Sequence, residues 1–102
     1  MSRTALVFDP KGFSGPPAGT QEGTRRLLRR TLWAIESQFS EPRSWRLFQL
    51  TVAMSEYRYG RYDAATALAQ RAMLPREQIP PVEVAGLLAF PLGVVRNQIL
   101  AL

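Results

Sequence analysis

Apolar residues recur at helical spacing in the stretch that follows Thr20, and this periodicity constrains the fold more than any other feature of the chain. Over residues 21–39, one face of the expected helix collects these side chains: Leu27, Leu28, Thr31, Leu32, Ile35 and Phe39. Thr20 is placed as the N-cap, and Glu22 in the first turn can pair with Arg25 and Arg26. The pattern predicts a helix with one buried face and one arginine-rich face.

A second helix is predicted over residues 42–59, after the helix-start signal Ser40-Glu41-Pro42. Its apolar residues fall on two roughly opposite stripes. One stripe holds Trp45, Phe48, Val52 and Tyr59, and the other holds Leu47, Leu50, Met54 and Tyr57. A helix of this kind packs on both sides, so we expect it at the centre of the domain.

Two further helical segments follow Gly60, which is expected to end the second helix. Residues 62–73 are rich in alanine, and small side chains let helix axes approach closely. Residues 74–81 are predicted to form a loop. Residues 82–102 have a helical pattern, but Pro91 is expected to divide it into segments 82–89 and 91–101. The inward stripe of the last segment is Leu92, Val95, Ile99 and Leu102.

Residues 1–20 are predicted to form an irregular N-terminal arm, because glycine and proline crowd residues 11–19. These glycines do not make a phosphate loop, since no strand of useful length precedes them and no Lys-Ser/Thr pair follows. The 102 residues fit one small domain. The sequence therefore predicts an all-α protein, a small helical bundle over residues 21–102 with an irregular arm and a Pro-kinked C-terminal helix.

A short motif spans the turn between the second and third expected helices. It consists of Gly60, Tyr62 and Ala65, with a second small residue, Ala72, seven positions later. This motif resembles a tetratricopeptide repeat (TPR), in which glycine permits a left-handed turn, the aromatic ring plugs the hairpin and the alanines let two helices touch. The resemblance implies a TPR-like helix-turn-helix over about residues 43–75.

The motif also departs from the family pattern. Gln49 and Glu56 stand where the family usually has aromatic residues, and Pro75 comes early. Only one repeat is visible, and an isolated repeat needs neighbours or caps to bury its faces. The resemblance therefore implies a single degenerate repeat flanked by other helices, with a generic helical hairpin as the alternative. Some small type III secretion chaperones resemble this layout as well.

The chain contains no cysteine and no histidine. Their absence excludes disulfides and thiolate chemistry, and it removes the commonest general base and the commonest metal ligand. No two acidic residues lie close together at helical spacing, so a carboxylate pair for acid–base catalysis is not expected either. We therefore expect a protein that is not an enzyme and that holds neither a metal nor a cofactor.

The expected function is non-catalytic protein binding, as a small accessory subunit, adaptor or chaperone of a larger assembly. Basic residues outnumber acidic ones by 13 to 8, which gives a net charge of +5. The predicted partner-binding residues share the outer face of the first helix: Arg25, Arg26, Arg29, Arg30 and Trp33. A tryptophan among arginines is either stacked under their guanidinium groups or exposed as an anchor for a partner. The partner is expected to offer an acidic or apolar docking surface, and a merely solvated helix face is the alternative.

The alternative function is that of a basic nucleic-acid-associated protein, which would bind phosphates through its arginine-rich helix faces. Aromatic and arginine residues alternate over residues 57–62, and such interleaving can stack bases and hold phosphates. Tyr57, Arg58 and Arg61 are the candidate contacts with nucleic acid or with a partner. We favour the interpretation that the tyrosines of this segment plug the helical turn.

Membrane and targeting signals are weak. The longest run without a charged or strongly polar residue, residues 84–95, falls short of the roughly 20 residues that a spanning helix needs. The first residues lack the apolar run of a secretory signal. We expect a cytoplasmic protein without a transmembrane span, with an organelle matrix as the alternative location.

Overall fold

The computed structural model describes residues 19–39, 43–79 and 92–102. Within these ranges the chain forms four α-helices and one short 3-10 helix, and it contains no strand. The elements are α1 (Gln21–Gln38), α2 (Arg43–Arg58), α3 (Tyr62–Arg71), η1 (Arg76–Gln78) and α5 (Leu92–Leu100). The predicted all-α class is confirmed.

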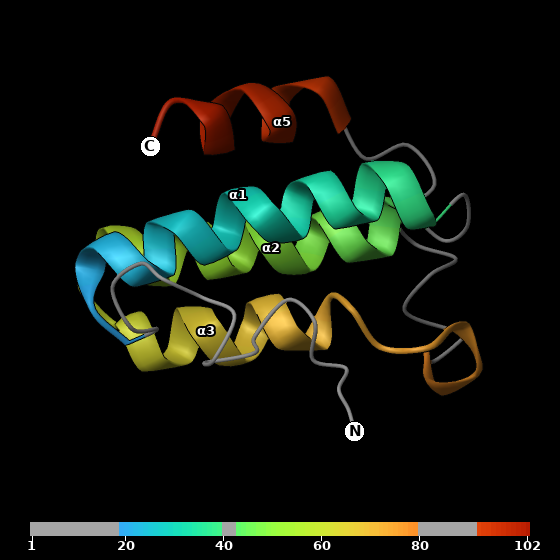
Figure 1. Ribbon diagram of the computed structural model, residues 1–102, viewed down its shortest axis with the longest axis horizontal. Helices are drawn as coiled ribbons and strands as arrows, with labels where there is room; N and C mark the ends of the chain where they lie inside the picture. Colours follow the sequence, from blue (N-terminus) through green and yellow to red (C-terminus); the bar gives the residue numbers. More distant parts are fainter. Residues whose placement is uncertain (1–18, 40–42, 80–91) are drawn as a thin grey trace.

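The helices α1 and α2 lie side by side in the middle of the molecule, with α3 along one side and α5 along the other (Figure 1). Each of the two central helices packs against every other described α-helix, whereas α3 and α5 do not contact each other. The predicted central place of the second helix is confirmed, and α1 shares that place.

Helix α1 begins and packs as its sequence predicts. The Thr20 hydroxyl accepts a hydrogen bond from the Gly23 N–H over 3.1 Å, which satisfies one of the free donors at the helix start. The predicted inner face is buried, with Phe39 partly buried at its end. It consists of Leu27, Leu28, Thr31, Leu32 and Ile35. The helix therefore presents one wide face to α2, α3 and α5.

The turn between α2 and α3 is a Schellman motif centred on Gly60. The Gly60 N–H donates to the Tyr57 carbonyl over 3.0 Å, and the Arg61 N–H donates to the Glu56 carbonyl over 2.9 Å. Gly60 has φ +81°, in the left-handed region that favours glycine. Four fully buried alanines lie in this hairpin: Ala53, Ala65, Ala69 and Ala72. The two helices form an antiparallel hairpin, and its membership of the TPR family stays a prediction.

A charged residue, Arg46, lies fully buried in α2. Its Nη1 donates to the carbonyl oxygens of Ala72 and Leu74, over 2.9 and 2.7 Å, just beyond the end of α3. Its guanidinium carbon lies 3.5 Å from the centre of the Phe39 ring. Burial lowers the pKa of Arg46, because the surroundings disfavour the charged form. This side chain ties the start of α2 to the end of α3 and to the end of α1.

The final helix starts at Leu92, one residue after Pro91. Val95 and Ile99 of its predicted inward stripe are buried, and Leu102 packs partly buried against the core. The predictions for residues 1–18, the helix over 82–89 and the break at Pro91 lie outside the described residues. Among the described helices, none combines the length and the apolar character that a membrane crossing requires.

Candidate functional site

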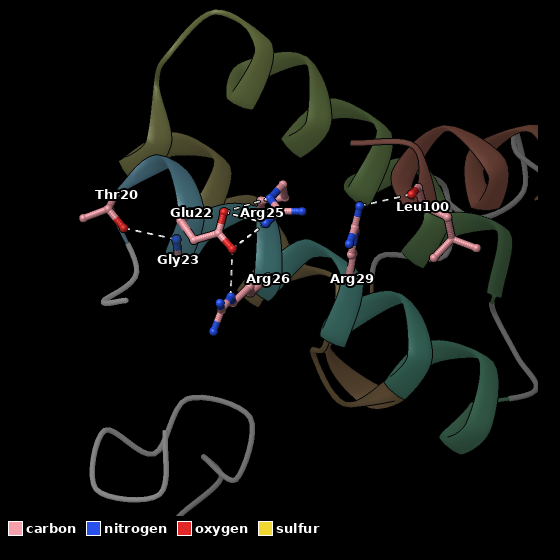
Figure 2. Close-up of polar contacts among 7 residues, drawn as sticks. All are labelled: Thr20, Glu22, Gly23, Arg25, Arg26, Arg29 and Leu100. Carbon is pink, nitrogen blue, oxygen red and sulfur yellow. Dashed lines mark hydrogen bonds and ion pairs between the residues drawn. The ribbon is translucent and has the colours of Figure 1, made fainter. Parts of the chain in front are cut away.

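The predicted basic face lies on the outside of α1, where Glu22 holds two of its arginines (Figure 2). The Nε atoms of Arg25 and Arg26 donate to the two carboxylate oxygens of Glu22, over 3.0 and 2.9 Å respectively. The hydrogen bonds from Arg25 and then Arg26 lower the pKa of Glu22 from its ordinary value of 4.5 to about 2. Both arginines therefore already have an acidic neighbour, which they share.

Arg29 points to a different partner. Its Nη2 donates to the main-chain carbonyl of Leu100 in α5 over 3.1 Å (Figure 2), and its buried Nε has no hydrogen-bond partner. A carbonyl carries no net charge, so the positive charge of Arg29 is not cancelled by this bond. Arg30 is half-buried and has a contact of its own within the chain.

The ring of Trp33 is exposed rather than covered by its neighbours. Its side chain is 58% exposed, whereas Trp45 in α2 is fully buried with the Arg71 guanidinium 5.3 Å from its ring centre. Tyr59 and Val94 are the other large apolar side chains that the described part of the chain exposes. The arginine-rich face of α1 thus carries one large ring that the fold leaves in water.

The seam between α1 and α5 runs beside Trp33. The Arg96 Nε meets the Glu36 carboxylate over 3.0 Å, so α5 is tied to α1 by this ion pair and by the hydrogen bond from Arg29. Arg29 and Glu36 stand one helical turn before and one helical turn after Trp33. The sequence does not predict this seam, because neither Glu36 nor Arg96 belongs to a motif that marks its partner.

The tyrosines around the α2–α3 turn divide into two groups. The rings of Tyr57 and Tyr62 lie 5.6 Å apart between their centres and are partly buried, so these two plug the turn as expected. Tyr59 is 72% exposed, and the expectation that it also plugs the turn is wrong. It follows the last residue of α2, where the chain has already begun to turn away from the helix axis.

Two of the candidate contacts at this turn are exposed arginines. Arg61 pairs with the Glu56 carboxylate, which raises the pKa of Arg61, and its guanidinium carbon lies 4.9 Å from the centre of the Tyr59 ring. Arg58 is exposed at the end of α2. These residues form a small aromatic and basic surface that the packing of the turn does not use.

The fold brings the start of α1 next to this turn. Tyr57 is near enough to Arg25 to contribute to the rise in the pKa of Arg25, after the larger effect of Glu22. A Cβ atom at Gly19 would lie 3.2 Å from Oδ1 of Asp63 in the first turn of α3. Arg25 of one set of predicted site residues therefore lies close to Tyr57 of the other, whereas Trp33 lies further along the helix.

The described residues contain no group of three or more acidic side chains that could hold a metal ion. The exposed side chains of the described residues include several guanidinium groups and the aromatic rings of Trp33 and Tyr59. No protein-family model, curated protein or solved structure matches this chain.

Proposed function

We propose that this protein is a non-catalytic protein–protein interaction module, an accessory subunit, adaptor or chaperone of a larger assembly in the cytoplasm. The observation that carries the proposal is Trp33, 58% exposed on the arginine-rich face of a central helix. Tryptophan and arginine are enriched among the residues that dominate binding energy at protein interfaces. The docking face consists of Trp33 with Arg25, Arg26, Arg29 and Arg30, and we name it the Trp33 face.

Two features support a binding face rather than a merely solvated one. Three arginines of this face are held within the chain, Arg25 and Arg26 by Glu22 and Arg29 by the α5 carbonyl, so binding would order fewer of their rotamers. The helix that presents Trp33 is anchored through its opposite side in the core, which keeps the backbone at Trp33 in a fixed place. The proposal includes the TPR-like interpretation of the α2–α3 hairpin, whose exposed side would add apolar contacts.

The test is purification of the tagged full chain from its native host at moderate salt, with and without nuclease, followed by mass spectrometry. We expect a fixed set of proteins to co-purify with the tagged chain at near-stoichiometric amounts, both with and without nuclease. The Trp33→Ala variant should no longer retain these proteins. Arg76→Ala is the control, because it truncates a long exposed side chain in η1, outside the docking face. Retention of the same set by Trp33→Ala would refute the proposal.

The second candidate function, contact with single-stranded nucleic acid, is favoured by the exposed ring of Tyr59 between Arg58 and Arg61. Fluorescence anisotropy with a labelled single-stranded oligonucleotide tests it. Binding through phosphates would weaken steeply with salt, with a log–log slope near the number of phosphates contacted. Tyr59→Ala would lower that affinity and Trp33→Ala would not, which is the reverse of the pattern expected for protein docking.

A further inference from the structure

The charges of the Trp33 face are distributed unevenly along α1. All four of its arginines precede Trp33, and the acidic residue that follows within one turn is Glu36. Arg96 of α5 lies against Glu36 and cancels its charge. Among the residues of the Trp33 face the surplus of positive charge therefore lies toward the N-terminus of α1, while Arg43, outside this face, donates to the Glu36 and Phe39 carbonyls at the other end of the helix.

The contacts on that half leave positive charge without a counter-charge. Glu22 brings one negative charge to two arginines, Arg25 and Arg26, so one positive charge remains. Arg29 adds another, because its partner is the uncharged carbonyl of Leu100. The Nε of Arg29 is buried, and its Nη2 donates to Leu100, so what the half-buried guanidinium offers a partner is its positive charge. A carboxylate is the group that best complements this charge, because hydrogen bonds between guanidinium and carboxylate groups are charge-assisted.

We infer that the partner of the Trp33 face is an acidic, amphipathic protein segment bound in one direction along α1. An apolar side chain of the segment covers Trp33, and its carboxylates lie toward Arg26 and Arg29. The opposite direction would place those carboxylates beside Glu36, which Arg96 has already neutralised. This inference rests on the proposed function and specifies the chemistry and orientation of the partner.

The test is selection of a phage library of short random peptides against the immobilised full chain. We expect enriched peptides that combine an aromatic or aliphatic residue with aspartate or glutamate on one side of it. The affinity of such a peptide should fall about tenfold or more in Trp33→Ala and about tenfold in Arg26→Glu. Arg76→Glu makes the same change of charge at an exposed position in η1 and should alter the affinity less than about twofold. Circular dichroism of each variant confirms that the helices are retained.

The outcomes separate the inference from the function on which it rests. Peptides that depend on Trp33 but lack acidic residues, or that bind Arg26→Glu as well as the original chain, would overturn the acidic partner and leave the docking function standing. A selection that yields no Trp33-dependent peptide from a chain that remains monomeric in sedimentation would overturn both. A Trp33-dependent dimer in sedimentation, without peptide enrichment, would show that a second copy occupies the face and would also overturn the inference.

Discussion

The Nη2 atom of Arg29 in α1 donates to the main-chain carbonyl of Leu100 in α5 over 3.1 Å, and this bond joins residues 71 positions apart. The last carbonyls of a helix have no donor within the helix, and a cation near that end is favoured by the helix dipole. Arg29 supplies both a hydrogen-bond donor and a positive charge at the C-terminal end of α5. The arginine that borders Trp33 is therefore also part of the attachment of the last helix.

Replacing Arg29 with methionine should loosen α5 while the rest of the bundle stays folded. The lost bond has a charged donor and contributes about 1.5 kcal/mol, so amide exchange in α5 should become roughly tenfold faster. Hydrogen–deuterium exchange over residues 95–100 measures this change. Arg26→Met is the control, because Arg26 pairs with Glu22 on its own helix. Equal loss of protection in both variants would contradict the assigned role of Arg29.

Replacing Arg46 with alanine should destabilise the fold by about 3 kcal/mol or more, since it removes two hydrogen bonds to main-chain carbonyls and leaves a cavity. Arg46→Met should cost about 1 to 2 kcal/mol less than alanine. Methionine keeps the packing against Phe39 and removes a buried charge whose Nε and Nη2 have no partner. Urea unfolding followed by circular dichroism gives both values. A methionine variant no more stable than the alanine variant would show that the packing of this side chain against Phe39 contributes little to the stability.

Replacing Gly60 with alanine should cost about 1 kcal/mol of stability, because φ +81° is strained for any residue with a Cβ atom. A Cβ atom at Gly60 would meet nothing within 4 Å, so the cost is conformational and not steric. Gly93 is the matched control, since it also has open space around a Cβ atom but lies in α5 with no positive φ. Gly93→Ala should raise stability by about 0.5 kcal/mol. Thermal unfolding of the two variants should show midpoints that move in opposite directions.

The signals for the helices are local, which is why the sequence predicts them well. The spacing of Leu28, Leu32 and Ile35 fixes the buried face of α1, and the same geometry places Trp33 outside it. The Thr20 hydroxyl accepts a hydrogen bond from the N–H of Gly23, only three residues later, so this helix cap can also be predicted from neighbouring residues.

The contacts that the sequence does not predict join distant parts of the chain. Arg46 stands between two apolar residues of α2, and its acceptors follow it by 26 and 28 positions. Nothing near Arg46 in the sequence distinguishes it from an exposed arginine. The prediction that Tyr59 plugs the turn is wrong for a related reason, since the rings of Tyr57 and Tyr62 already pack there. Competition for one space is a property of the packed structure and not of the alternating pattern.

Replacing Glu22 with glutamine should remove the part of the folding stability that depends on the ionised Glu22 carboxylate. The folded pKa of Glu22 is about 2, below its ordinary 4.5, so its contribution is complete above about pH 4.5 and is lost as the pH falls toward 2. The stability difference between the original chain and Glu22→Gln should therefore be largest at neutral pH and should vanish near pH 2. Because the pair is exposed, added salt should shrink the difference. Urea unfolding midpoints of both proteins over this pH range measure the stability difference. The control is Glu77→Gln, because Glu77 is an exposed acid without an ion pair to the described residues. This variant should keep the pH profile of the original chain. A difference that grows as the pH falls would contradict the assignment.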